Sequence, residues 1–145
     1  MRIVMLEVSH WHTPMYLAAV KEMPGMELAA VSDKRLPLAQ ARGEKCGCRV
    51  YESSAEMLDR EKPDFAFVFG EHAEMASLAA MVMERGIPFF VEKPAGLNAD
   101  KLQPVADQAR RQGLFNAVCY AYRAAPITDL LVRWRDQGLL GRLTS

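Results

Sequence analysis

The chain has 145 residues, of which 50% are hydrophobic and 25% are charged, and its 18 basic and 18 acidic side chains leave no formal net charge. This length suits one compact domain, or one domain and the start of another, and it excludes a (β/α)₈ barrel, which needs roughly 200 residues or more. The balanced charge predicts no nucleic-acid partner and no anionic membrane surface, so a bound anion needs a local site.

Short apolar runs alternate with helical stretches along the chain. The runs predicted to be strands are residues 3–8, 27–32, 49–51, 65–69, 88–91 and 114–120. Most are continuously apolar, which is typical of a parallel sheet with helices on both faces. The stretches predicted to be helices are residues 13–24, 37–46, a short segment after Ser53, 72–85, 99–112 and 126–137. We therefore expect an α/β fold, a doubly wound parallel sheet in three α/β/α layers with strand order 3-2-1-4-5-6.

Capping patterns predict where these helices begin. Thr13 before Pro14 is expected to cap the first helix, and Ser53 with Glu56 forms a capping box for the third. Pro104 lies within the fifth, which predicts either a kink or a start later than Asn98 indicates. In the fourth helix a stripe of apolar residues should face the sheet. These residues are Met75, Leu78, Ala79, Val82 and Met83.

The number of cysteines and the lengths of the apolar runs bear on the compartment. Three cysteines do not resemble a disulfide framework and favour a reduced, cytoplasmic protein. Met1 is not followed by the pattern of a signal peptide. The longest apolar runs are far shorter than the ~18 residues of a membrane span. We expect a soluble protein with no membrane partner.

Unusual residues occupy the place where a dinucleotide normally binds. In an open parallel sheet this place lies beyond strands one and four, here residues 7–12 and 70–72. The slots of a G-x-G-x-x-G turn hold Glu7, Ser9 and His12. The dipole of the following helix favours a phosphate, whereas the Glu7 carboxylate would repel it. His10 and His12 are expected to offset this repulsion partly, above all when protonated below about pH 6.5.

Asp33 ends the second strand roughly 20 residues after this turn, where an acid accepts the ribose hydroxyls of an adenosine. The alternative is that Asp33 caps the second helix. An acid here favours NAD over NADP, although Lys34 and Arg35 would tolerate a 2′-phosphate. Trp11, at the tip of the preceding turn, is either a lid over a ligand or a helix-packing residue.

The sequence Val91-Glu92-Lys93-Pro94 follows the fifth strand and places a charged pair at the carboxyl end of a central strand. Its simplest interpretation is a surface ion pair, but the position favours a site. With this motif the chain resembles the N-terminal domain of the Gfo/Idh/MocA (glucose–fructose oxidoreductase and inositol dehydrogenase) family. The resemblance rests on Ala30-Val31-Ser32-Asp33, Gly86, Glu92-Lys93-Pro94, Tyr122-Arg123 and Gly138-Leu139-Leu140-Gly141.

The resemblance implies a Rossmann-type domain over residues 1–121 that binds NAD, with its phosphorylated form NADP as the alternative. It implies that Lys93 is catalytic, that Glu92 positions it, and that Arg123 contacts the cofactor or its surroundings. The strand ends and the resemblance together predict these cofactor contacts: Ser9, His10, Trp11, His12, Thr13, Asp33, Lys34, Gly70, Glu71, Glu92, Lys93 and Arg123. Gly70-Glu71 replaces the Thr-Pro that is usual after strand four.

The resemblance also implies an NAD(P)-dependent oxidoreductase that transfers a hydride from a CH–OH group of a sugar-like or polyol substrate. Residues 122–145 would begin a second domain for substrate binding and oligomerisation, so the 145 residues are not expected to be active alone, and the full-length protein is expected to be a homo-oligomer. The alternative function is a non-catalytic relative that binds a metal or a small polar ligand at His10, His12 and His72. We assign no metal ligand in the primary hypothesis.

Overall fold

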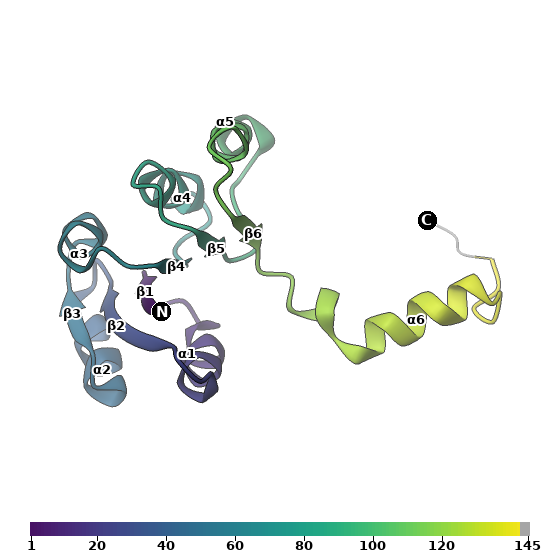
Figure 1. Ribbon diagram of the computed structural model, residues 1–145, viewed down its shortest axis with the longest axis horizontal. Helices are drawn as coiled ribbons and strands as arrows, with labels where there is room; N and C mark the ends of the chain where they lie inside the picture. Colours follow the sequence, from purple (N-terminus) through teal and green to yellow (C-terminus); the bar gives the residue numbers. More distant parts are fainter. Residues whose placement is uncertain (143–145) are drawn as a thin grey trace.

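Six strands form one parallel sheet in the order β3-β2-β1-β4-β5-β6 in the computed structural model, which describes residues 1–142 (Figure 1). The strands are β1 (Arg2–Leu6), β2 (Glu27–Ser32), β3 (Arg49–Tyr51), β4 (Phe65–Val68), β5 (Phe89–Val91) and β6 (Asn116–Val118). Every neighbouring pair is parallel. The predicted doubly wound sheet and its strand order are confirmed.

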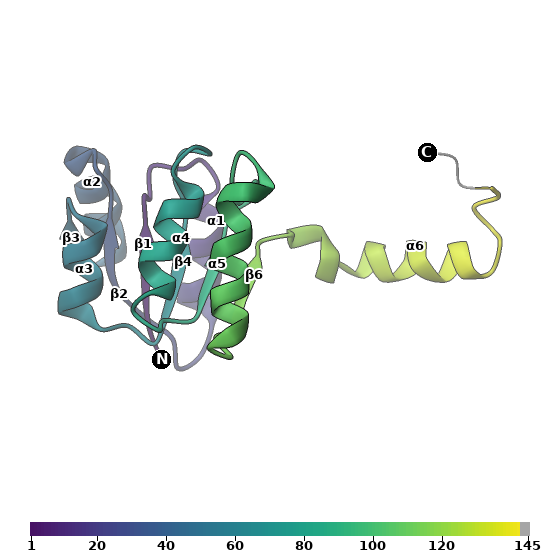
Figure 2. The same ribbon diagram turned by 90° about the horizontal axis from the view of Figure 1, so that it is seen from above.

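Helices cover both faces of the sheet, as predicted. They are α1 (Thr13–Glu22) and α2 (Leu36–Cys46) on one face, and α3 (Ser54–Glu61), α4 (Met75–Met83) and α5 (Ala99–Arg111) on the other (Figure 1). The sheet is therefore the middle of three layers, and in the view from above α3, α4 and α5 lie in front of it (Figure 2). Each β-α-β crossover returns the chain to the end of the sheet where the strands begin, so all strands run in the same direction. Because β1 and β4 are paired, their carboxyl ends are neighbours.

The central strands are apolar along most of their length because successive side chains enter two separate cores. On β1, Ile3 and Met5 pack on the side of α1 and α2, whereas Val4 and Leu6 pack on the side of α3, α4 and α5. None of these four residues is more than 1% exposed. Side chains alternate between the faces of a strand, so a strand buried on both faces has no polar positions.

Two of the predicted helix caps are present and one is wrong. The Ser53 hydroxyl accepts a hydrogen bond of 3.3 Å from the Glu56 amide, as the capping box requires. Asn98 caps α5 through the Lys101 amide at 3.1 Å, so this helix does not start later despite its internal proline. Thr13 is instead the first helical residue of α1, where no side chain caps the helix.

Several boundaries differ from the prediction. α4 begins at Met75 rather than at His72, because the preceding residues form a turn in which the Glu74 amide donates to the Glu71 carbonyl at 2.8 Å. β1 ends at Leu6, because Glu7 has a positive φ. β6 is shorter than predicted at both ends. All five residues of the apolar stripe on α4 are buried against the sheet, as predicted.

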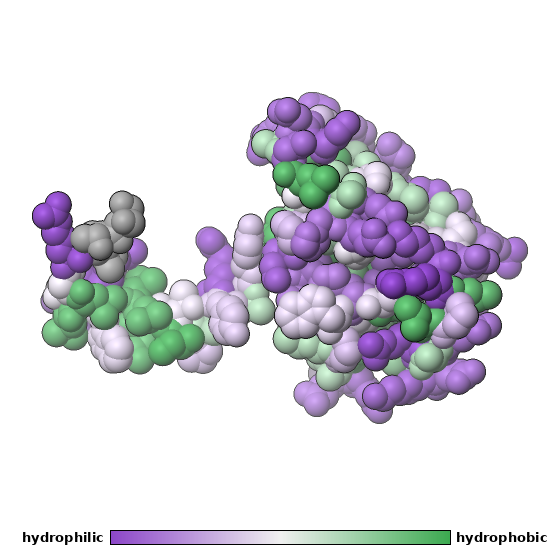
Figure 3. All heavy atoms as spheres, turned by 180° about the vertical axis from the view of Figure 1, so that it is seen from behind, coloured by the Kyte–Doolittle hydropathy of each residue, from purple (hydrophilic) through white to green (hydrophobic). Residues whose placement is uncertain are grey.

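The chain beyond β6 leaves the three-layer body. A 3₁₀ turn, η1 (Ala121–Ala124), leads to α6 (Pro126–Asp136), which projects away from the sheet (Figures 1 and 2). No residue of α6 is buried, and apolar side chains gather on its surface (Figure 3). Residues 143–145, at the end of the predicted second domain, lie outside the described residues. Within residues 1–142, no helix has the length and apolar character needed to cross a membrane.

Candidate functional site

The ends of β1, β2 and β4 enclose a pocket of about 250 Å³. Its lining residues are Glu7, Ser9, His10, Trp11, Lys34, Arg35, Gly70 and Glu71. The structure thus brings together the two strand ends that were expected to share a crevice. Gly70 is required here, because its φ is +139° and a Cβ would lie 2.7 Å from the Leu78 Cδ1 atom.

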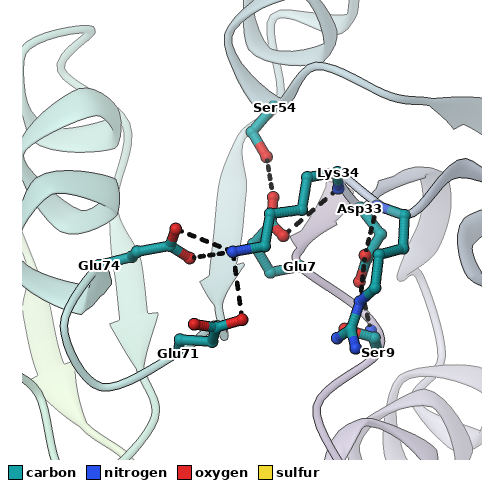
Figure 4. A network of polar contacts seen from close by, with 8 residues as sticks. Glu7, Ser9, Asp33, Lys34, Ser54, Glu71 and Glu74 are labelled. Carbon is teal, nitrogen blue, oxygen red and sulfur yellow. Dashed lines mark hydrogen bonds and ion pairs between the residues drawn. The ribbon is translucent and has the colours of Figure 1, made fainter.

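Glu7 keeps the backbone conformation of the glycine whose slot it occupies. Its φ is +53°, in the left-handed region that favours glycine. The side chain is turned inward and is only 7% exposed. Its carboxyl group accepts hydrogen bonds from the Ser54 hydroxyl at 3.2 Å and the Lys34 amide at 3.4 Å (Figure 4). Burial raises the pKa of Glu7 above the ordinary value, and the nearby Asp33 carboxylate adds to the rise.

Asp33 is completely buried at the end of β2 and ties this strand to the turn after β1. Its Oδ2 atom accepts a hydrogen bond of 2.6 Å from the Ser9 amide, and its Oδ1 atom accepts one of 2.9 Å from the Arg35 amide (Figure 4). It does not cap α2, whose capping position is Arg35. The Asp33 side chain has no exposed surface and does not line the pocket.

The two cations beside Asp33 are held differently. Lys34 Nζ lies 2.8 Å from a Glu74 carboxylate oxygen and 3.2 Å from one of Glu71 (Figure 4). The hydrogen bond to Glu74 is the main cause of a raised pKa of Lys34. The Arg35 guanidinium contacts the Ser9 hydroxyl and lies 3.5 Å from the Asp33 carboxylate. Lys34 therefore closes one side of the pocket, and Arg35 covers the turn after β1.

An aromatic cluster forms the other wall of the pocket. The His10 ring lies 5.9 Å from that of Phe69, and its Nδ1 atom accepts a hydrogen bond of 3.2 Å from the His12 amide. Burial lowers the pKa of His10, which disfavours the protonated ring. This shift weakens the expected offset of the Glu7 charge by protonated His10. Trp11 is 74% exposed and packs on His12, with Lys93 Nζ 5.6 Å from its ring.

Three buried polar atoms without a hydrogen-bond partner lie where α1 begins and β5 ends. They are His12 Nδ1, Thr13 Oγ1 and Glu92 Oε2. His12 Nδ1 and Glu92 Oε2 are 3.3 Å apart but lack hydrogen-bond geometry. The other Glu92 oxygen accepts a hydrogen bond of 2.8 Å from the Lys93 amide and so fixes the start of the turn that carries Lys93. Unsatisfied buried groups mark a place for a missing polar partner.

Six of the predicted cofactor contacts, and one further residue of the alternative metal cluster, do not line the pocket. The six are His12, Thr13, Asp33, Glu92, Lys93 and Arg123. Arg123 is exposed in η1, and His72 is exposed in the turn after β4; neither lines the pocket. Among residues 1–142, no three His, Cys, Asp or Glu side chains converge as metal ligands. Ser54 and Glu74 were not predicted to belong to the site. The sequence offered no signal for Ser54 and Glu74 beyond their polar residue types, because each contacts a site residue that is far away in the sequence.

A pocket at the switch point of a doubly wound sheet, beside an uncapped helix start, defines the class of dinucleotide-binding domains. The model of the oxidoreductase family with an NAD-binding Rossmann fold, Gfo/Idh/MocA, matches residues 2–120. The chain belongs to this family. The matched domain is NAD-binding, so the cofactor that the family implies is NAD.

Two relatives illustrate this membership. D-glucoside 3-dehydrogenase from Escherichia coli is 32% identical over 119 residues, which cover 81% of this chain and 34% of that protein. Rhizopine catabolism protein MocA from Rhizobium meliloti is 28% identical over 130 residues, which cover 88% of this chain and 40% of that protein. The chain therefore matches between one third and two fifths of the length of these relatives.

Solved structures show the same fold. The 3-ketoreductase KijD10 from Actinomadura kijaniata, crystallised with NADP and TDP-benzene, superposes with a TM-score of 0.87 at 20% identity, covering 95% of this chain and 42% of that one. Myo-inositol 2-dehydrogenase from Lactobacillus plantarum has a TM-score of 0.87 at 17% identity, and the match covers 98% of this chain and 42% of that one. At these identities the likeness concerns the fold alone.

The residues present fit a dinucleotide on two observations. The turn after β1 keeps the left-handed backbone of the first glycine slot. The start of α1 has no acidic residue in its first turn, so its positive dipole end favours a phosphate, although the Thr13 and Met15 amides already donate to the His10 and His12 carbonyls. Asp33 lies at the end of β2, where ribose hydroxyls are recognised in such folds, but its side chain is fully buried. The buried carboxyl of Glu7 is the feature least suited to an anionic ligand.

Proposed function

We propose that this chain is the cofactor-binding part of a dehydrogenase that acts on a CH–OH group of a sugar-like or polyol substrate. The observation that carries the proposal is the shared pocket of the β1 and β4 ends, which Trp11 lines, with Lys93 Nζ 5.6 Å from the Trp11 ring. The names of the relatives, a glucoside dehydrogenase among them, support the substrate class.

Each part of the site has a role in this proposal. Asp33 would accept the hydroxyls of the adenosine ribose once a movement exposed its buried carboxylate, while the positive dipole end of α1 and the residues from Ser9 to Thr13 would bind the pyrophosphate. Lys34, Gly70 and Glu71 would enclose the adenosine side. NAD(P), when bound, supplies the hydride acceptor.

Lys93 is the candidate catalytic residue of the proposal. Its ammonium would hold the reacting hydroxyl of the substrate or relay its proton, and a buried Glu92 would keep the Lys93 backbone in place through the 2.8 Å hydrogen bond to its amide. The partnerless Oε2 atom of Glu92 would be satisfied by His12 or by a polar group of the ligand. Arg123 would reach the cofactor only if η1 moved toward the body.

We further propose that residues 1–121 form the nucleotide-binding domain and that residues 122–145 begin a second, substrate-binding and oligomerising domain. The exposed α6 and the greater length of the relatives support this division. Under this proposal the 145 residues bind cofactor but do not turn over substrate, and the whole protein is a cytoplasmic homo-oligomer. The free thiols of Cys46, Cys48 and Cys119 are compatible with a reducing compartment.

Calorimetric titration of the 145-residue chain with NAD⁺, NADH, NADP⁺ and NADPH tests the proposal. Saturable binding of at least one of them below millimolar concentration supports it, and lowered affinity of Asp33→Ala locates the site. If none binds at millimolar concentration while zinc binds tightly, the alternative function at His10, His12 and His72 replaces it.

A further inference from the structure

A groove of about 860 Å³ runs between α1 and α2, on the face of the sheet opposite α3, α4 and α5 (Figure 1). No residue lines both this groove and the candidate nucleotide pocket. Its apolar surface includes Leu17, Met26 and Leu28. The small side chains of Ala18 and Ala29 border the same space and leave it open. The groove is therefore a separate, partly apolar cavity.

The charges around this groove are one-sided. Arg2, Lys21, Arg42, Lys45 and Arg49 line it, and Glu27 is its single acidic residue. Arg2 is paired with Glu27 at 3.3 Å and with the buried Glu61 at 2.8 Å, and Arg49 is also paired with Glu61.

The other three cations are left without an acidic partner. Lys21 on α1, and Arg42 and Lys45 on α2, form no ion pair with any residue between 1 and 142. They stand on both walls of the groove, since one comes from α1 and two come from α2. An anion seated between the helices would be attracted from either side.

We propose that this groove binds a small amphipathic anion of the fatty-acid type, with its hydrocarbon chain on the apolar floor and its carboxylate between the cations of the two walls. The volume lies within the ~300–1,000 Å³ of small-molecule pockets. A stable protein partner would need about 800 Å² of surface on each side, more than a groove between two short helices offers. A purely inorganic anion would leave the apolar floor unused.

The three cysteines provide the test, because two of them line the groove and differ in reactivity. Cys46 is exposed, whereas burial raises the pKa of Cys48 to about 11. Cys119, outside the groove, is half-buried, and burial raises its pKa to about 11 as well. The thiolate is the reactive form, so iodoacetamide at pH 8 should modify Cys46 first. Cys46 alkylation therefore reports on whether the groove is filled.

The rate of Cys46 alkylation, followed by tandem mass spectrometry on the 145-residue chain, should fall several-fold in the presence of dodecanoate. Dodecanol has the same chain without the charge, and acetate has the charge without the chain; neither should protect Cys46 at the same concentration. Protection by dodecanol equal to that by dodecanoate overturns the proposal, as does an unchanged rate with dodecanoate. Protection by poly-glutamate but not by dodecanoate overturns it in favour of an acidic protein partner.

Variants separate the groove from the general charge of the protein. Arg42→Gln combined with Lys45→Gln should raise the dodecanoate concentration needed for protection by about ten-fold, each variant being compared with its own rate without ligand. The matched control, Lys101→Gln with Arg111→Gln on α5, removes the same charge from the opposite face and should change nothing. Ala18→Phe should fill the groove and abolish binding measured by calorimetry. An equal loss in the control pair contradicts the proposed site.

Discussion

The Ser54 hydroxyl donates a hydrogen bond of 3.2 Å to the Glu7 carboxyl, and it lies 2.8 Å from the hydroxyl of Ser32. This buried chain of three side chains joins the turn after β1, the end of β2 and the start of α3. It explains how a glutamate occupies a slot that normally belongs to glycine: the side chain is directed into the fold, where a partner satisfies it.

Replacement of Glu7 by glycine should tighten NAD(P) binding by about five-fold or more, which corresponds to about 1 kcal/mol. The change removes a buried carboxyl from the first glycine slot, and glycine adopts the φ of +53° without strain. Calorimetry with NADH and NADPH measures the effect. Glu7→Gln is the control for charge, because it keeps the shape of the side chain. Unchanged affinity in both variants would remove Glu7 from any role in cofactor binding.

The raised pKa of Glu7 predicts a dependence of stability on pH. Burial favours the protonated form in the folded chain, so the folded pKa lies above the ordinary glutamate value of 4.5. Its contribution is fully present below that value and is lost as the pH rises through the folded pKa. The free energy of unfolding of the wild type should therefore fall relative to Glu7→Gln as the pH rises above 4.5. Urea denaturation at several pH values measures the difference, and parallel curves would contradict the prediction.

Arg35 should discriminate between the two cofactors. It lies beside Asp33, where a 2′-phosphate would be recognised, and its guanidinium is not buried. Loss of one charge-assisted hydrogen bond predicts that Arg35→Gln weakens NADPH binding by about ten-fold while affecting NADH much less. Parallel titrations with the two reduced cofactors give the ratio. A ratio equal to that of the wild type would show that Arg35 does not contact the phosphate.

Glu61 should be important for stability and irrelevant to cofactor binding. Its buried carboxylate accepts hydrogen bonds from Arg2 at 2.8 Å, from Tyr51 at 2.6 Å and from Arg49. Glu61→Ala leaves these groups without their shared partner and should lower the free energy of unfolding by about 2 kcal/mol in urea. Glu56→Ala on the same helix removes an exposed pair with Arg60 and should cost less than about 1 kcal/mol. Similar losses in the two variants would argue against the buried network.

The parallel sheet could be predicted because its cause is local. Residues 65–68 and 89–91 are apolar at every position, and such runs separated by helical stretches leave few alternatives to a doubly wound fold. The buried stripe on α4 follows from the same periodicity. The ends of helices and strands were less predictable where a contact with a residue distant in the sequence competes with the local pattern. The turn before α4, for example, brings Glu74 to Lys34, 40 residues away.

The sequence by itself determined the order of strands and helices and the strand ends that meet, because hydrophobic periodicity and the handedness of β-α-β units are encoded locally. Only the tertiary structure decided which way the Glu7 side chain turns, that Asp33 is held by the Ser9 and Arg35 amides, and that Arg123 lies away from the pocket. It also decided that three cations face a groove without acidic partners. These features depend on side chains from elements far apart in the chain, and only packing brings them within the few ångströms over which hydrogen bonds and ion pairs act.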